Sequence, residues 1–466
     1  MNVSKWLFSV GALSLGLFIT SCSPKTTVSR YSDDPHADSL SLEIKKKEKN
    51  AAPADVDYYK EYRIRYEDYE YADNIKTVLL YRDGFELSAP IINFNSDEKL
   101  VLKFDDLNAG LLHYKYTIIH CDAYWRPSQL MPQEYINGFT EDDITTQKYS
   151  FNTLQRYTSY SLTFPTSNLT PSKSGNYVLV VYPEGEPDSV SLTRRFMIVD
   201  NKLSVNAKVN RARDIEYHNY KQEVDFTIDG SQFRITDPYK NLKVVLQQNN
   251  RWDNAVNNLQ PAYVKGDLLD YNYLDACVFS GGNEFRWFDI KGLKWKPETT
   301  RKVEKDSAGY EVYINQDERA TFKTYYSLKD INGRRLIKSE ENVTDTDIES
   351  EYVHVHLFLN YEAPLSNGSI YVLGALTGWR FSNEGLMKYN YARHGYEANL
   401  YLKQGYYNYQ YVFVENGKQQ GDESLVEGMH YETENDYTIY AYYRAEGTLY
   451  DQLIAVKQFN TYSSEK

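Results

Sequence analysis

The residues whose types could support nucleophilic catalysis are His120, Cys121 and Asp122, where a thiol has an imidazole and a carboxylate as sequence neighbours. A cysteine nucleophile needs its base within hydrogen-bond reach. The segment 114–121 alternates as a strand does, so His120 and Cys121 are expected on opposite faces of a sheet. We therefore expect a core cysteine beside a hydrogen-bonded histidine at a strand end, and no catalytic dyad.

A second pair of candidate ligands is formed by His354 and His356, which share one face of an expected strand. Two histidines at this spacing can contribute to a metal site, but no third ligand follows at a recognisable spacing. The sequence also contains no G-x-S-x-G, G-x-G-x-x-G, phosphate-loop or C-x-x-C motif. We therefore expect no metal, no cofactor and no enzyme activity.

The elements that must position these residues are short strands, because period-two alternation dominates and no stretch keeps a helical apolar period. Residues 57–201 are predicted to form an immunoglobulin-like β-sandwich, since short strands alternate there with turn signals such as Asp83-Gly84 and Asn137-Gly138. The expected strands are residues 76–81, 90–94, 100–104, 114–121, 159–164, 177–182 and 195–199.

The rest of the chain continues in the same manner, so the predicted fold class is all-β, with tandem β-sandwich domains. Residues 202–350 are predicted as a second β-domain and residues 351–466 as an early-set-like, carbohydrate-binding-module-like β-sandwich. The expected strands are residues 224–228, 242–247, 262–264, 285–290, 310–314 and 335–338, and then 353–359, 369–373, 395–402, 407–415 and 436–443.

The N-terminal segment predicts export. Lys5 precedes an apolar run over residues 6–19, and the small residues before Cys22 are typical of a lipobox. The run is shorter than the roughly 20 residues that cross a bilayer. We expect residues 1–21 to be a signal peptide, Cys22 to be lipidated, and residues 22–56 to be a flexible tether poor in large apolar residues. An ordinary signal peptide with an incidental cysteine is the alternative.

Composition excludes some partners. The chain has 65 acidic and 52 basic residues, and its net charge of −13 disfavours binding to nucleic-acid phosphates. Its 45 tyrosines suit strands and wet interfaces, which favours a β-rich module over a helical enzyme. Cys121 and Cys277 each lie in an apolar run, where a buried thiol acts as a small hydrophobe. Export would permit a disulfide between them, and this possibility stays open.

The C-terminal segment carries a recognisable order of motifs. Residues 369–374 lead into 375–379, and a later run over 405–417 ends in Asn416-Gly417. This order resembles glycogen-binding modules and the early-set domains joined to glycogen-branching enzymes. The resemblance implies that Trp379 matches an exposed sugar-stacking position, although Lys418, Gln419 and Gln420 stand where a second stacking aromatic is expected. A binding surface of Trp379, Tyr406, Tyr407 and Tyr409 is the resulting expectation, and a packed turn residue is the alternative for Trp379.

A longer series of motifs runs in order from about residue 57 to 459. It comprises residues 120–128 (HCDAYWRPS), 134–139 (EYINGF), 150–153 (SFNT), 157–160 (YTSY), 174–177 (SGNY), 281–286 (GGNEFR) with Phe288-Asp289, and 374–379 (GALTGW). In this order the chain resembles the plug proteins of the type IX secretion system of Bacteroidota, formerly a domain of unknown function.

The resemblance implies a periplasmic plug subunit. Such a protein would bind the outer-membrane translocon barrel and seal its periplasmic opening when no substrate is engaged. The expected partners are that barrel and, through Cys22, the outer membrane on its periplasmic side; no nucleic acid and no small-molecule substrate are expected. The alternative function is a glycan-binding accessory lipoprotein of a polysaccharide-uptake system, which Trp379 and the sandwich pattern suggest.

Overall fold

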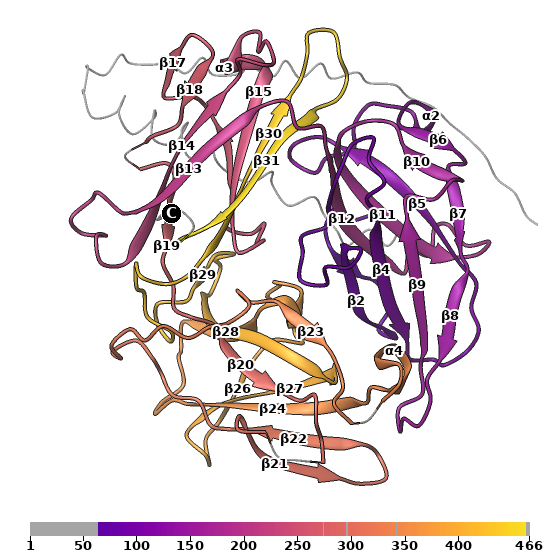
Figure 1. Ribbon diagram of the computed structural model, residues 1–466. Helices are drawn as coiled ribbons and strands as arrows, with labels where there is room; N and C mark the ends of the chain where they lie inside the picture. Colours follow the sequence, from indigo (N-terminus) through magenta and orange to yellow (C-terminus); the bar gives the residue numbers. More distant parts are fainter. Residues whose placement is uncertain (1–63, 274, 295–296, 342, 463–466) are drawn as a thin grey trace, which may run out of the picture. The chain divides into compact units, whose positions relative to one another are not determined.

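The computed structural model describes residues 64–462 except 274, 295–296 and 342. All described residues belong to the second of two compact units, residues 62–466. The expected signal peptide, Cys22 and the tether over residues 22–56 lie outside the described residues. Strands dominate this unit (Figure 1), which confirms the all-β prediction. In the described part of the chain, no helix has the length and apolar character needed to cross a membrane.

The α-helices of the described residues are single turns: α2 (Pro132–Tyr135), α3 (Pro238–Asn241) and α4 (Thr346–Glu349). The first sandwich consists of two sheets around one apolar core. One sheet has the order β1 (Tyr69–Glu70), β12 (Leu192–Val199), β11 (Gly175–Pro183), β5 (Tyr114–Cys121) and β7 (Glu141–Ile144), with β3 (Ile91–Asn93) parallel to β12. The other has the order β2 (Ile75–Arg82), β4 (Leu100–Asp106), β9 (Thr158–Phe164) and β8 (Thr146–Tyr149). A short antiparallel pair, β6 (Ile136–Gly138) with β10 (Leu169–Pro171), completes this part.

The second sandwich also encloses one core between two sheets. One sheet has the order β13 (Ser204–Arg211), β14 (Lys221–Asp229), β18 (Leu268–Asp270) and β17 (Tyr263–Lys265), with β19 (Val278–Ser280) beside β14. The other has the order β16 (Val256–Leu259), β15 (Leu242–Gln248), β30 (Asp436–Tyr443) and β31 (Gln452–Asn460).

The third sandwich is built around β28 (Gly405–Glu415), the longest strand. It pairs with β20 (Arg286–Asp289), β23 (Arg335–Ile337), β25 (Gly368–Leu373) and β29 (Gly421–Asp422). The facing sheet has the order β21 (Thr300–Lys305), β22 (Tyr310–Ile314), β24 (Tyr352–Asn360), β27 (Gly395–Lys403) and β26 (Lys388–Asn390).

Strand pairing crosses the domain boundary predicted at residue 350. β15 pairs with β30, so Leu246 lies opposite Ile439, and Figure 1 shows the yellow strands β30 and β31 beside the magenta strands of the second sandwich. In the other direction, β20 and β23 pair with β28 of the third sandwich. Local alternation identifies a strand but does not name its partner, so a boundary drawn from sequence order cannot follow pairs some two hundred positions apart.

A fourth apolar cluster joins the first and second sandwiches. Val178 and Tyr182 of β11 pack there with Val245, Tyr440 and Leu453 of the second sandwich. β11 is therefore covered on both faces and buried over residues 175–182, which explains its continuous apolar sequence. Each fully buried side chain of this size contributes roughly 1.5–3 kcal/mol, so this cluster helps to hold the first and second sandwiches together.

Candidate functional site

The His120-Cys121 pair is part of the core. The two side chains are 1% and 0% exposed, and the His120 ring meets Tyr177 edge-on at 4.9 Å between ring centres. Burial lowers the pKa of His120 to about 4 and raises the pKa of the Cys121 thiol above its usual range. An imidazole with so low a pKa is too weak a base to take the proton of this thiol, and neighbouring side chains of a strand point to opposite faces, so the two residues cannot act as base and nucleophile. Cys277 is also a free, buried thiol, so the disulfide left open by the sequence is not formed.

His354 and His356 share one face of β24 and have local partners. The His356 ring stacks on Tyr313 at 4.4 Å, and its Nε2 contacts the Glu311 carboxylate. His354 Nδ1 lies 3.3 Å from the Asn399 side-chain oxygen. No group of three histidine, cysteine or acidic residues is placed to hold a metal ion within the described residues.

Trp379 lies in the turn after a short 3-10 segment, Ala375–Thr377, with a φ of 57°. Its ring is half-buried and meets Phe285 edge-on at 5.9 Å. The Arg251 guanidinium lies 5.3 Å from the ring centre. A Cβ on Gly333 would come within 2.3 Å of Trp379 Cη2, so glycine is required for this close approach. The indole is thus held by packing on several sides.

The three tyrosines of β28 do not form one surface. Tyr407 and Tyr409 are each 1% exposed and belong to the core, where the Tyr409 hydroxyl donates to Asp317 at 2.7 Å. They cannot contribute to a binding surface, which corrects the expectation for these two residues. Tyr406 points to the other face of the strand and stacks on Trp287 at 5.6 Å. A binding role for Trp379 and Tyr406 stays a prediction.

The residue after Trp379 instead joins two sandwiches. Arg380 donates to the Glu70 carboxylate at 2.7 Å and to the Asp68 carbonyl at 2.7 Å, both beside β1 of the first sandwich. Arg194 contacts the other Glu70 oxygen. Burial opposes ionisation of Glu70, but Arg194 and Arg380 hold its pKa well below the usual range. The turn that carries Trp379 is therefore a joint between the first and third sandwiches.

A buried ion pair forms a second joint between these two sandwiches. Lys403 Nζ lies 2.6 Å from an Asp105 oxygen, and the side chains are 2% and 3% exposed. The Tyr352 hydroxyl donates to the same carboxylate at 2.7 Å, and Lys403 also donates to the Asp347 carbonyl at 2.7 Å. With its charges paired and hydrogen-bonded, this network fixes one relative arrangement of β4 and β27.

A third joint, between the first and second sandwiches, is centred on the buried carboxylate of Asp451. Asp451, 1% exposed in its side chain, accepts from Lys243 at 2.9 Å and from Arg444 at 2.6 Å. It also accepts the backbone N–H of Ala123, two residues after the end of β5, at 3.0 Å. Although burial opposes it, the Ala123 N–H and the two cations keep the pKa of Asp451 below its usual value. This joint lies next to the apolar cluster between the same two sandwiches.

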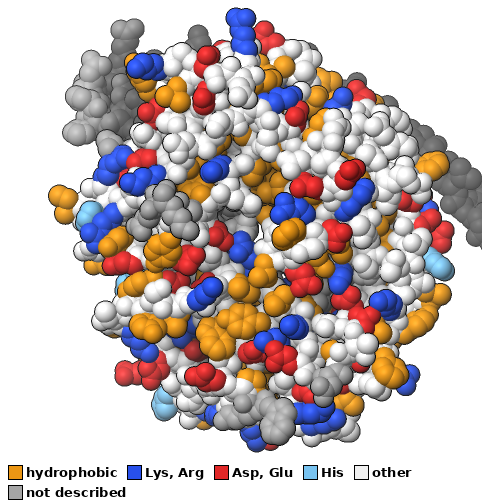
Figure 2. Space-filling model, viewed as in Figure 1, with side chains coloured by type: hydrophobic (Ala, Val, Ile, Leu, Met, Phe, Trp, Pro, Cys, Tyr) orange, Lys and Arg blue, Asp and Glu red, His pale blue; other side chains and the backbone are white. Residues whose placement is uncertain are grey.

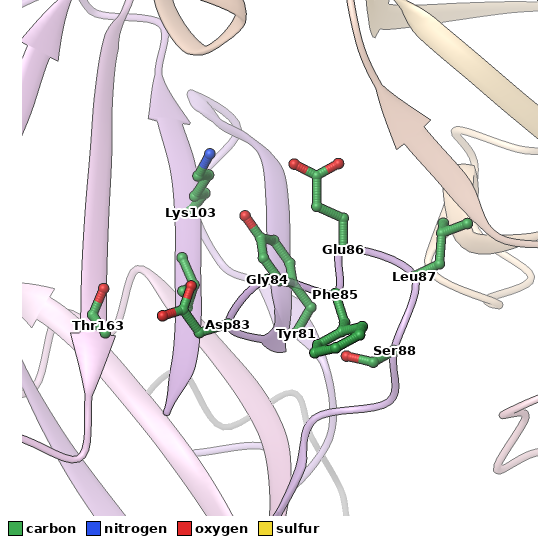
Figure 3. Close-up of a pocket in the computed structure, with 10 residues that line it drawn as sticks. Tyr81, Asp83, Gly84, Phe85, Glu86, Leu87, Ser88, Lys103 and Thr163 are labelled. Carbon is green, nitrogen blue, oxygen red and sulfur yellow. The ribbon is translucent and has the colours of Figure 1, made fainter. Parts of the chain in front are cut away.

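An open pocket lies beside the turn that follows β2 (Figure 3). It is lined by Tyr81, Asp83, Gly84, Phe85, Glu86, Leu87, Ser88, Val101, Lys103 and Thr163. Lys103 is the basic residue among those that line the pocket, and its Nζ pairs with the Asp347 carboxylate at 2.7 Å. Phe85 is 59% exposed at the rim, with the Arg82 guanidinium 4.7 Å from its ring centre. This lining offers a mixed surface with its cation already neutralised, and no acid–base pair suited to catalysis.

The surface charge is dispersed on the face drawn in Figure 2, where acidic and basic side chains are intermixed with hydrophobic ones. A dispersed pattern of this kind suits a short-range, shape-dependent contact better than long-range steering by one sign of charge.

Comparison with known proteins finds similarity to a family model and to solved structures. Residues 75–200 match the family model described as the type 9 secretion system plug protein 1st domain. The whole fold is similar to the crystal structure, at 2.30 Å resolution, of a hypothetical protein from Parabacteroides merdae ATCC 43184. The two chains are 34% identical; the match covers 85% of this chain and 100% of that chain, with a TM-score of 0.82. No curated protein matches the chain.

Proposed function

The chain belongs to the type 9 secretion system plug protein family, and from this premise we propose that it is the periplasmic plug of a type IX translocon. In this role it binds the outer-membrane barrel and seals its periplasmic opening while no substrate is engaged. The role is mechanical: the chain blocks a path and carries out no reaction.

The observation that carries the proposal is the set of joints between the sandwiches. A stopper must remain one folded body under the forces that act on it at a pore. Asp105 with Lys403 and Glu70 with Arg380 join the first and third sandwiches, and Asp451 joins the first and second. Separating the first and second sandwiches would also expose the apolar cluster between them to water, at a cost of about 25 cal/mol for each Å² of apolar surface. Such a body resists being drawn through a channel piece by piece.

Attachment to the outer membrane is part of the same proposal. A lipidated Cys22 with a second buried acyl chain would give a stable anchor. A flexible tether of about 35 residues spans tens of ångströms, at about 5–6 Å × √n, and would raise the plug's effective concentration at the pore. On this view the anchor strengthens sealing without being needed for folding.

The test is deletion of the gene in cells whose translocon lacks its other partners. The outer membrane of such cells should admit a large antibiotic that intact cells exclude, and the wild-type chain supplied in trans should restore exclusion. Unchanged permeability after deletion would contradict a sealing role.

A glycan-binding role receives little support from the aromatic geometry. Tyr407 and Tyr409 are buried, and Trp379 is engaged by Phe285 and Arg251. A sugar platform needs a free ring face, and this arrangement leaves Trp379 packed on several sides. The proposal of a plug therefore stands ahead of the glycan-binding alternative.

A further inference from the structure

Two loop tips carry large apolar side chains in almost complete exposure. Ile215 is 94% exposed and Phe322 is 88% exposed, the two highest values among the large hydrophobic side chains of the described residues. Isolated exposed hydrophobics are common, but neighbouring ones on a soluble protein mark an interaction site. The question is whether these two belong to one surface.

Both loops are attached to the same segment, residues 425–432. On one side, the Tyr431 N–H donates to the Asn219 carbonyl at 3.2 Å. On the other, the Ala320 N–H donates to the Val426 carbonyl at 2.7 Å, and the Tyr325 hydroxyl donates to the Glu432 carbonyl at 3.1 Å. In Figure 1 the loop between β13 and β14 lies beside the yellow segment that follows β29. We call residues 212–220, 318–328 and 425–432 the three-loop face.

The three-loop face is rich in exposed apolar and aromatic side chains. In addition to the two loop tips, its members and the adjoining Tyr462 contribute Tyr217 (37% exposed), Tyr220 (47%), Tyr326 (73%), Leu328 (46%) and Tyr462 (41%). Tyrosine and phenylalanine are enriched in protein–protein interfaces, where a few such anchors contribute most of the binding energy.

Cations lie on the aromatic rings of this face. The Arg211 guanidinium is 3.6 Å from the Tyr431 ring centre, and Lys221 Nζ is 3.6 Å from that of Tyr217. The Arg319 guanidinium lies 5.6 Å from the Phe322 ring centre. Among the described residues, neither Arg211 nor Lys221 has an acidic side chain in ion-pair contact, whereas Arg319 already donates to the Leu425 carbonyl at 3.2 Å. The charges of Arg211 and Lys221 are therefore open to a carboxylate supplied from outside.

The face is supported from below. The Tyr325 hydroxyl also contacts the Glu284 carboxylate, which is 9% exposed and accepts the Glu434 N–H at 3.3 Å. The Tyr325 ring lies 5.4 Å from that of His430. This buried layer orders the loop that carries Phe322, so the cost of ordering the loop on binding is reduced.

We propose that the three-loop face is the surface through which this chain docks on the translocon barrel, and that the barrel presents an apolar pocket for the loop tips, with carboxylates opposite Arg211 and Lys221. The identity of the partner rests on the proposed function. A lipid surface fits less well, because Ile215 stands between Asp214 and Glu216 and the chain carries a net charge of −13. A protein pocket can accommodate an apolar tip between two carboxylates, whereas an anionic membrane repels them.

The test measures recovery of the barrel from detergent-solubilised membranes by the purified, tagged full-length chain. The face variant is Ile215→Ser with Phe322→Ser. The matched control is Phe139→Ser with Tyr391→Ser, which removes side chains that are 67% and 73% exposed elsewhere on the molecule. We expect the face variant to bind the barrel at least about tenfold more weakly, as hot-spot truncations do, and the control to bind as the wild type does. Matched thermal unfolding curves establish that both variants are folded.

The outcomes separate the two proposals. If the wild type recovers the barrel and the face variant recovers it equally well, the docking face is refuted and the plug function stands. If the control loses binding as strongly as the face variant, the docking face is again refuted. If the wild type recovers no barrel, the plug function falls and the docking proposal with it. A benzoylphenylalanine placed at position 322 should crosslink to the barrel; crosslinking only to a second copy or to lipid would contradict the proposal.

Discussion

Lys403 and Asp105 stand 298 positions apart in the sequence and form an ion pair at 2.6 Å with almost no exposure to solvent. The pair connects β27 of the third sandwich to β4 of the first. Both charges are buried away from water, so each is stabilised by the opposite charge of the other. This relationship turns neighbouring β-domains into one mechanical body, which is the property that a plug requires.

Removing one partner of this pair should destabilise the protein strongly. We expect Lys403→Ala to lower the free energy of unfolding by about 3–5 kcal/mol, because Asp105 would remain buried without a counter-charge. Urea unfolding followed by intrinsic fluorescence measures this. Lys148→Ala, which breaks the exposed pair with Asp345, is the control and should cost less than about 1 kcal/mol. Equal costs for the two variants would show that the buried pair is not a joint.

Stability should fall as pH rises through the titration of Glu284. Burial raises the pKa of this carboxyl to about 7 in the folded protein, above the value of roughly 4.3 in an unfolded chain. Between these values the folded state binds more protons, so the free energy of unfolding decreases with pH and levels off above about 7. Asp330, with its pKa raised to about 6 by burial, acts in the same direction.

The Glu284→Gln variant isolates this effect. Its melting temperature relative to the wild type should rise from pH 5 to pH 7.5, because the variant has no buried charge to develop. Glu186→Gln, at an exposed position, should show no such trend. A pH-independent difference for Glu284→Gln would mean that this carboxyl does not titrate in the predicted range.

Alanine substitutions at two glycines distinguish the effect of backbone strain on stability from the effect of steric crowding. Gly333 and Gly84 have φ of 74° and 79°, so alanine is disfavoured at both by about 1 kcal/mol. A Cβ at Gly333 would also meet Trp379 and Phe285, whereas a Cβ at Gly84 meets nothing within 4 Å. We expect Gly333→Ala to lower the melting temperature clearly more than Gly84→Ala does. Equal shifts would mean that the Trp379 turn is loosely packed.

The thiols of Cys121 and Cys277 should be free but protected. Both are buried, and burial raises the pKa of each thiol. Iodoacetamide should leave both unmodified in the native protein and alkylate both in guanidinium without any reductant, as mass spectrometry of the peptides can show. A peptide pair linked by a disulfide under those conditions would contradict the structure.

Much of the strand content could be predicted from the sequence, because alternation is a local signal. The expected strands at 114–121, 310–314 and 436–443 coincide with β5, β22 and β30. Pairing could not be predicted in the same way, since β15 meets β30 and β20 meets β28 through contacts far apart in the chain. Hydrogen bonds along a strand edge are similar for any partner, so the sequence near one strand does not specify the other.

In the candidate site, too, the local pattern could be predicted from the sequence and the long-range contacts could not. Alternation along β28 separates Tyr406 from Tyr407 and Tyr409, but only the packing shows that the latter two face the core. The contacts of Asp105 and Asp451 could not be predicted from the neighbouring sequence, because their partners come from other sandwiches. The exposure of Ile215 and Phe322 could be predicted from the local sequence. Each is a large apolar residue inside a polar, turn-rich segment, which indicates an exposed anchor.

The central claim is that this chain closes the translocon barrel, and ionic conductance tests it most directly. The purified barrel, stripped of its periplasmic partners and reconstituted in a planar bilayer, should conduct continuously. Addition of the full-length chain to the periplasmic side should reduce that conductance to near the bilayer background, while addition to the opposite side should not. A barrel whose conductance is unchanged at saturating chain would contradict the account.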